Sequence, residues 1–345
     1  MPQLNLHCSP SELLGAILVS VYKLLILSVF TIGALVVLPF KAITWLLFPA
    51  KPTSFNSICI TGASSGIGAE LARQYAAPGV RLVLTARRVD RLEAVKDDCV
   101  ARGAEVVICS VDVNDVEATS SALLAADDER PIDLLIANAG VHPYQLSSHV
   151  DRVVSAAAAA AQSGQASGQA PCREVMVLAA TLAPVTDCNV CGVVNTVAPL
   201  LTRMQSRAQG QIVLTASVAS YCAMTDHEWV AYHASKVWVR SFGMGLRGLL
   251  QPYGVGVTVL CPGLVASEMA TSINSRETII KNKAVPTGVA VAAMRRAIGT
   301  NVGVHVMREH SSEMQGVYFL GYNVLPPFAF NAMMAGFRME VPPKK

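Results

Sequence analysis

Apolar runs that alternate with amphipathic segments are the feature that most narrows what this chain can fold into. The strand-like runs after Pro52 are Phe55–Thr61, Val80–Thr85, Ala104–Val111 and Ile132–Ala137. The segments of helical periodicity between them are Gly66–Ala77, Val89–Ala101 and Val116–Ala126. Strands separated by helices pair in parallel, and the helices cover both faces of the sheet. We therefore predict an α/β fold with a doubly wound parallel sheet.

The alternation is interrupted between residues 141 and 187, where a low-complexity Ala/Ser/Gly/Gln stretch occupies residues 156–171. We expect an insertion here, with a short alanine-rich helix and a flexible loop. After it the pattern resumes. The elements predicted there are helices around 186–205 and 230–250, strands at Gln211–Thr215 and Val255–Leu260, and a helix at Ala290–Ile298. The apolar C-terminal stretch, residues 316–337, predicts a last strand and a surface against a membrane or a partner, and the sequence leaves that choice open.

The N-terminal stretch is the most apolar part of a chain with 52% hydrophobic and 15% charged residues. Residues 13–38 carry Lys23 as their one charge, and about 20 apolar residues span a bilayer. We predict a membrane anchor at residues 1–52 and an α/β domain at 53–345. A membrane hairpin or in-plane segment and a cleaved signal peptide are the alternatives. Lys41 and Lys51 after the span favour a cytosolic location for the large domain.

The net charge and the cysteine pattern argue against a nucleic-acid-binding protein and against a metal-binding protein. The net charge is +3, without a basic stripe, so no nucleic-acid partner is expected. The nine cysteines are scattered, and Cys188 and Cys191 form a CxxC pair without a second pair or a histidine cluster. We expect reduced thiols and no metal site.

The stretch Thr61-Gly62-Ala63-Ser64-Ser65-Gly66-Ile67-Gly68 lies between the first predicted strand and helix. In a doubly wound sheet this is where a dinucleotide binds, with its pyrophosphate at the helix N-terminus. Gly62 allows a tight turn, Gly66 lets the backbone approach phosphate, and Gly68 lets helix and strand pack closely. The sequence thus predicts a Rossmann-type fold that holds a cofactor.

Tyr232 and Lys236 are four residues apart and share one face of a predicted helix. An ammonium group about 5 Å from the phenol contributes roughly 3 kcal/mol towards lowering the tyrosine pKa from its usual value near 10. Ser217 precedes Tyr232 by fifteen positions, just after a predicted strand. A hydroxyl there can polarise a carbonyl while tyrosine transfers a proton.

Together these motifs resemble the short-chain dehydrogenase/reductase family over roughly residues 55–270. The resemblance implies Asn189, Ser217, Tyr232 and Lys236 as catalytic residues, with Asn189 holding a relay water. The positions it implies for cofactor binding are Gly62, Ser64, Ser65, Gly66, Ile67, Gly68, Arg87, Asp112, Asn138, Gly140, Tyr232, Lys236, Pro262, Gly263, Val265 and Ser267. Asn138 and Asn189 are 51 positions apart, about double the family's usual spacing, and the insertion accounts for it.

Charge predicts which cofactor binds. An acid after the second strand binds the ribose hydroxyls of NAD, whereas a base there suits the 2′-phosphate of NADP. This chain reads Thr85-Ala86-Arg87-Arg88 at that place. We predict NADP(H), with Arg87 as the phosphate partner; for Arg88, a solvated helix start is the alternative interpretation. The family resemblance implies that Asp112 contacts the adenine.

The expected function is interconversion of a ketone and a secondary alcohol on a lipophilic substrate. The family and the anchor together favour 3-ketosphinganine, with 3-ketoacyl-CoA, steroids and retinoids as alternatives. A membrane-tethered binding protein without chemistry is the alternative from another class. The expected location is the endoplasmic reticulum membrane with the catalytic domain facing the cytosol, a luminal or secreted enzyme being the alternative, and the expected assembly is a homodimer.

Overall fold

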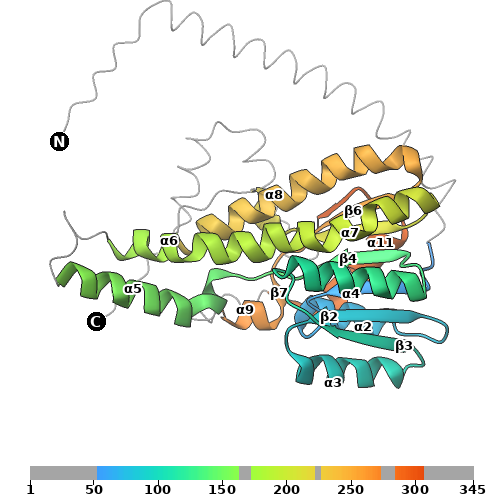
Figure 1. Ribbon diagram of the computed structural model, residues 1–345, viewed down its shortest axis with the longest axis horizontal. Coiled ribbons are helices and arrows are strands. Elements are labelled where there is room, and N and C mark those ends of the chain that lie inside the picture. Colours follow the sequence, from blue (N-terminus) through green and yellow to red (C-terminus); the bar gives the residue numbers. More distant parts are fainter. Residues whose placement is uncertain (1–52, 163–171, 222–226, 273–283, 307–345) are drawn as a thin grey trace, which may run out of the picture. The chain divides into compact units, whose positions relative to one another are not determined.

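The computed structural model describes residues 53–162, 172–221, 227–272 and 284–306. The expected anchor and the apolar C-terminal stretch lie outside these residues. A parallel sheet in the order β3-β2-β1-β4-β5-β6-β9 forms the centre (Figure 1). Its strands are β1 (Ser57–Thr61), β2 (Arg81–Ala86), β3 (Glu105–Ser110), β4 (Leu134–Ala137), β5 (Gln211–Thr215), β6 (Gly256–Cys261) and β9 (Val304–Val306). This is the predicted Rossmann-type sheet.

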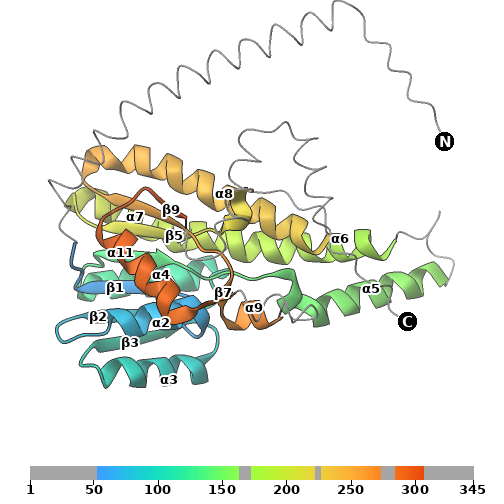
Figure 2. The same cartoon turned by 180° about the vertical axis from the view of Figure 1, so that it is seen from behind.

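Two helical layers cover the sheet, as Figures 1 and 2 show from opposite sides. One layer consists of α2 (Gly66–Tyr75), α3 (Val89–Val100) and α11 (Thr287–Gly299), and the other of α4 (Val116–Glu129), α7 (Gly192–Arg207) and α8 (His227–Leu250). Side chains alternate between the faces along each strand. Ile58 and Ile60 of β1 therefore join the first core, and Cys59 joins the second.

The insertion builds a helical pair that extends beyond the carboxyl edge of the sheet (Figures 1 and 2). It begins with a 3-10 turn, η1 (Pro143–Leu146), and α5 (Ser147–Gln162), which packs on α6 (Arg173–Thr186) through Val150, Val177 and Ala180. The predicted helix around 186–205 begins too late, because α6 continues through a π-helical turn, Asp187–Cys191, into α7. Pro184 lies inside α6, and the helix continues past it.

Shorter elements complete the carboxyl edge. The 3-10 turns η3 (Val218–Tyr221) and η4 (Gln251–Tyr253) flank α8, and β7 (Val265–Ala266) pairs with β8 (Val285–Pro286) beside α9 (Glu268–Ser272). Among the described residues, one helix is long and apolar enough to cross a membrane, Arg173–Arg207. Its C-terminal half buries Val197, Leu200 and Met204 against the sheet, so it serves as a core helix of the fold.

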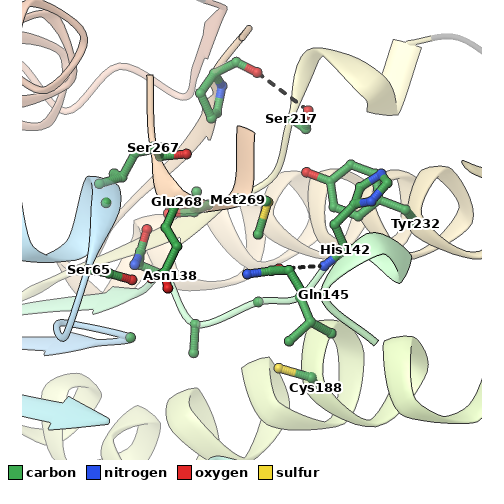
Figure 3. Close-up of a pocket in the computed structure, with 18 of the residues that line it drawn as sticks. Ser65, Asn138, His142, Gln145, Cys188, Ser217, Tyr232, Ser267, Glu268 and Met269 are labelled. Carbon is green, nitrogen blue, oxygen red and sulfur yellow. Dashed lines mark hydrogen bonds between the residues drawn. The ribbon is translucent and has the colours of Figure 1, made fainter. Parts of the chain in front are cut away.

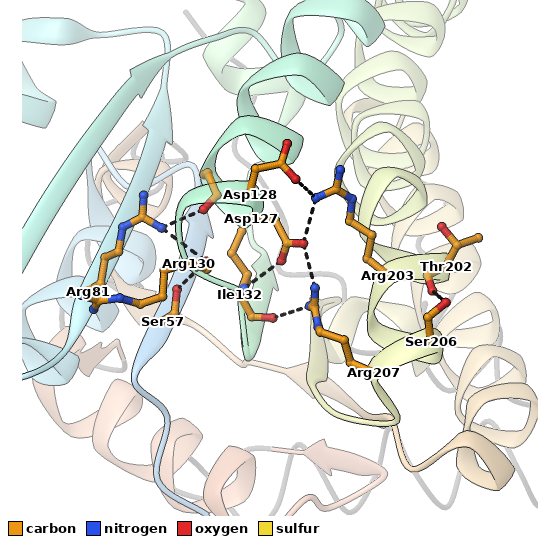
Figure 4. Close-up of polar contacts among 11 residues, drawn as sticks. Ser57, Arg81, Asp127, Asp128, Arg130, Ile132, Thr202, Arg203, Ser206 and Arg207 are labelled. Atoms are coloured by element: carbon orange, nitrogen blue, oxygen red, sulfur yellow. Dashed lines mark hydrogen bonds and ion pairs between the residues drawn. The ribbon is translucent and has the colours of Figure 1, made fainter.

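Hydrogen bonds and ion pairs of charged side chains connect helices and strands at the amino edge of the sheet, opposite the carboxyl edge (Figure 4). Asp127 near the end of α4 accepts hydrogen bonds from Arg203 and Arg207 of α7 and from the Ile132 N–H that precedes β4. Arg81, at the start of β2, is 1% exposed and donates to the Ala126 carbonyl at 2.8 Å and to Glu129. These contacts fasten α4 and α7 to the strand starts.

Candidate active site

A cavity of about 820 Å³ opens at the carboxyl edge, where β1 and β4 lie side by side and the chain reverses its strand order. This switch point is where doubly wound sheets bind their ligands. Figure 3 shows Ser65, Asn138, Ser267 and Glu268 on one side of the cavity and Ser217, Tyr232 and His142 on the other. The two sides carry the two halves of the predicted site.

The glycine-rich loop forms the first side and has the shape that a dinucleotide needs. Gly62 and Gly66 have positive φ values of 67° and 55°, which side chains adopt only with strain. A Cβ atom on Gly62 would lie 2.9 Å from the Ala139 backbone, and one on Gly66 would lie 3.2 Å from the Ser267 side chain. The first N–H groups of α2 have no partner within the helix and can bind phosphate. The loop therefore fits the pyrophosphate of NAD(P)(H).

Two arginines follow β2 at the other end of this side. Arg87 is 66% exposed, and its guanidinium lies 3.5 Å from Asp112. Arg88 turns inward and donates to the hydroxyls of Ser64 at 3.2 Å and Ser65 at 2.8 Å. Arg88 also pairs with Glu268 at 3.0 Å. Arg88 lies at the start of α3 with a side chain that is 41% exposed, and the same side chain links α3 to the glycine-rich loop.

The second side brings Tyr232, Lys236 and Ser217 together. Tyr232 and Lys236 lie on α8 and are 8% and 4% exposed. The Lys236 ammonium lies 5.6 Å from the centre of the Tyr232 ring and donates to the Thr215 carbonyl at 3.0 Å. Ser217, just after β5, is held by the Ala219 N–H and the Pro262 carbonyl. The strand end and the helix face thus present three polar groups to one cavity.

Burial dominates the titration of this pair. Burial raises the pKa of the Tyr232 phenol to about 12, although a hydrogen bond with Ser217 acts in the opposite direction. Burial also lowers the pKa of Lys236 to about 8. The Tyr232 pKa therefore does not show the lowering expected from Lys236. At neutral pH Tyr232 is protonated, which suits a proton donor to a carbonyl.

Asn189 lies behind the cavity wall and does not line it. Its side-chain oxygen accepts from the Val141 N–H at 2.8 Å, and its amide donates to the Val141 carbonyl and the Ser235 hydroxyl at 3.0 Å. It sits in the π-helical turn, a feature frequent at functional sites. A Cβ atom on Gly140 would lie 3.1 Å from Asn189 and 3.4 Å from the Lys236 nitrogen. The relay role of Asn189 stays a prediction.

Most of the predicted site residues meet in the one cavity. Those that line it are Gly62, Ser64, Ser65, Gly66, Ile67, Arg87, Asp112, Asn138, Gly140, Ser217, Tyr232, Lys236, Pro262, Gly263, Val265 and Ser267. Gly68, like Asn189, lies behind the lining; a Cβ atom there would lie 2.3 Å from the Gly62 carbonyl oxygen. Gly68 therefore acts by letting α2 pack against the loop.

Sequence reasoning missed His142 and Glu268. The His142 ring is 1% exposed and packs on Tyr232 and Trp229, with ring centres 4.6 and 4.5 Å apart. The sequence signal that could have identified His142 is its position two residues after Gly140, a predicted cofactor-binding residue. Glu268 follows Ser267 directly, but its partners Arg88 and Arg91 lie far away in the sequence.

The described residues contain no cluster of three or more His, Cys, Asp or Glu side chains that could hold a metal ion. Cys188 lines the cavity, and burial raises the pKa of its thiol. Cys191 is exposed, and both thiols are free.

Comparison with known proteins agrees with this geometry. Residues 56–278 match the short chain dehydrogenase family. An uncharacterized oxidoreductase of Myxococcus xanthus is 32% identical over 64% of this chain and 76% of its own length. The human dehydrogenase/reductase SDR family member 7 is 32% identical over 61% of this chain and 56% of its own length.

Solved structures share the fold. A short-chain dehydrogenase from Sphingobium yanoikuyae in complex with NADPH has a TM-score of 0.59 at 21% identity and covers 84% of this chain and 98% of its own. Levodione reductase has a TM-score of 0.58 at 21% identity and covers 73% of this chain and 95% of its own. The chain belongs to the short chain dehydrogenase family. It is an oxidoreductase of that family, which uses NAD(P)(H).

Proposed function

We propose that this oxidoreductase uses NADP(H) to interconvert a ketone and a secondary alcohol on a lipophilic substrate. One observation carries the proposal: a single cavity places Tyr232, Lys236 and Ser217 across from a glycine-rich loop that is followed by Arg87 and Arg88. The loop suits a pyrophosphate, and the facing hydroxyls suit a carbonyl oxygen.

The chain's own groups would act on the carbonyl oxygen. The bound cofactor supplies the hydride for the carbonyl carbon. The Ser217 hydroxyl orients the carbonyl, and the Tyr232 phenol donates the proton that completes the alcohol. Lys236, held by the Thr215 carbonyl, places a positive charge near the phenolate that remains. Electrostatic support of this kind acts strongly in a site that excludes water.

Two observations support NADP(H) over NAD(H). No acid ends β2, and Arg87 and Arg88 begin the segment after it. Arginine binds phosphate through several donors in a fixed geometry. One of the solved relatives with this fold is described with NADPH.

A lipophilic substrate fits the apolar side chains around the catalytic group. Leu146, Val218, Trp229, Leu264 and Met269 line the cavity. We propose 3-ketosphinganine as the first ketone to test, followed by 3-ketoacyl-CoA, steroid and retinoid ketones. The apolar stretch at residues 13–38 supports a membrane tether, proposed in the endoplasmic reticulum with the catalytic domain facing the cytosol, and a homodimer is the proposed assembly.

Turnover of NADPH against this ketone panel tests the proposal. Tyr232→Phe removes the proton donor and keeps the ring, so we expect kcat to fall about 10²–10⁴-fold. Tyr253→Phe is the matched control, because Tyr253 is exposed in η4 and does not line the cavity. The proposal fails if the wild type oxidises no NADPH with any ketone, and a non-catalytic binding protein then becomes the better reading. It also fails if Tyr232→Phe keeps full activity.

A further inference from the structure

Glu268 is an acid that lines the cavity and lies against Arg88, in the part of the site that follows β2. It is the first residue of α9 and follows Ser267 directly. Both of its carboxylate oxygens accept from one nitrogen of Arg88 at 3.0 Å, and one of them accepts from Arg91 at 2.8 Å. Figure 3 shows Glu268 on the same side of the cavity as Ser65 and Ser267.

Arg88 connects this carboxylate with the glycine-rich loop. The same guanidinium that holds Glu268 donates to the hydroxyls of Ser64 and Ser65. Carboxylate and phosphate oxygens are the preferred partners of a guanidinium, so either group can occupy these donors. The Arg88–Glu268 pair therefore has the form of an arginine–phosphate contact.

The position of Arg88 indicates which phosphate competes. Arg88 follows β2, and the end of the second strand lies by the adenosine ribose in this type of fold. The pyrophosphate belongs instead to the N–H groups at the start of α2. An anion on Arg88 thus corresponds to the 2′-phosphate, the group that distinguishes NADP(H) from NAD(H).

We propose that Glu268 is a specificity-determining residue that competes with the cofactor's 2′-phosphate for Arg88. The inference rests on the proposed use of NADP(H). Two anions that share one guanidinium repel each other, so NADPH has to displace the carboxylate, whereas NADH leaves the Arg88–Glu268 pair intact. Arg91 gives the displaced carboxylate a second partner. Glu268 thus weakens NADPH binding selectively and reduces the preference for NADPH over NADH.

Titration of the full chain with NADPH, NADH and 2′,5′-ADP tests the inference without any substrate. Glu268→Gln removes the charge and keeps the shape. Because an exposed ion pair contributes up to about 1 kcal/mol, we expect NADPH and 2′,5′-ADP to bind roughly threefold to fivefold more tightly. NADH affinity should stay within about twofold of the wild type, since NADH does not displace the carboxylate. Nicotinamide fluorescence follows NADPH and NADH, and calorimetry follows 2′,5′-ADP.

Glu93→Gln is the matched control, because it makes the same change on α3 at a residue paired with Lys96 and outside the cavity. It should leave all three affinities unchanged. Unchanged or weaker NADPH binding in Glu268→Gln overturns the inference, and so does an equal gain for NADH. These results leave the proposed function standing if the wild type binds NADPH and reduces a ketone. A wild type that binds no NADPH defeats the proposed function itself.

Discussion

His142 is a histidine that the fold keeps neutral. Its Nδ1 atom accepts from the Tyr144 N–H at 3.4 Å, and its ring lies against Tyr232 and Trp229. Burial lowers the pKa of His142 to about 3, with further lowering by His233 and by Lys236. An unfolded chain takes up this proton near pH 6.5. Between those values the unfolded state binds more protons at this residue, so acid favours unfolding.

We therefore expect the free energy of unfolding to fall as the pH is lowered from about 6.5 towards 3. This residue contributes up to about 1.4 kcal/mol per pH unit. His142→Phe keeps an aromatic ring and removes this pH-dependent contribution. The free energy of unfolding of the variant should therefore fall less steeply as the pH is lowered. Urea unfolding at pH 7.5, 5.5 and 4.5 measures the difference. His149→Phe on α5, outside the cavity, should keep the wild-type slope, and equal slopes for wild type and His142→Phe would contradict the argument.

Single residues differ in how far the sequence could predict them. Tyr232 and Lys236 were predictable because their spacing itself places them on one helix face. Arg87 and Arg88 are neighbours in the sequence, and nothing in their spacing says which one turns inward. That direction depends on Ser64 and Ser65 in the glycine-rich loop, and on Glu268 at a distance of 180 positions in the sequence. Long-range side-chain pairs of this kind require the folded chain.

At the scale of elements, the amino edge of the sheet shows how α4 and α7 are fastened. The Asp127 side chain is 2% exposed and receives Arg207 at 2.7 Å and Arg203 at 3.2 Å. Partial burial alone would raise its carboxyl pKa, but hydrogen bonds from Arg207, the Ile132 N–H and Arg203 hold it below the usual value overall. Asp128 also pairs with Arg203 but is 65% exposed.

The two neighbouring acids give a matched pair of variants. Asp127→Asn removes the buried carboxylate that Arg203 and Arg207 share, and we expect it to lower the free energy of unfolding by about 2 kcal/mol. Asp128→Asn removes the same charge from an exposed ion pair and should cost less than about 1 kcal/mol. Denaturant unfolding of both variants at pH 7 provides the comparison. Equal losses would show that burial does not set the strength of this network.

Most element positions followed from apolar periodicity alone. The strands β1 to β6 and the helices α2, α3, α4, α8 and α11 lie within a few residues of the predicted ranges. The strand β9 has three residues, too few to show a period. The start of α6 was missed because α6 lies within residues 141–187, where the low-complexity stretch interrupts the alternating pattern. Packing of α6 on α5 and α8, which the sequence pattern does not reveal, supports the helix through Pro184.

At the scale of the whole molecule, the two edges of the sheet have different roles, one structural and one functional. The amino edge carries the ion pairs that fasten helices to strand starts, whereas the carboxyl edge carries the cavity. Among the described residues, the hydrophobic cores between them begin at Phe55. The chain also divides by contacts into Met1–Pro52 and Thr53–Lys345. A reductase domain that folds independently of an anchor remains our prediction.

We expect residues 53–345 to fold and to bind NADPH with the affinity of the full chain. The full chain should sediment with membranes and resist alkaline carbonate extraction, because residues 13–38 can span a bilayer. Fractionation and fluorescence titration of both forms provide the measurements. Release of the full chain by carbonate would contradict the anchor. Failure of residues 53–345 to fold would contradict the predicted division.

The paired hydrogen bonds between Val141 and Asn189 join positions 48 residues apart in the sequence. They fix where the chain leaves the sheet and where it returns to the catalytic helix layer. The connection between these points, which includes α5 and α6, can therefore change in length without moving Asn189. During evolution this family could gain or lose a helical pair here. Such a change would alter the mouth of the cavity, while the catalytic residues kept their positions.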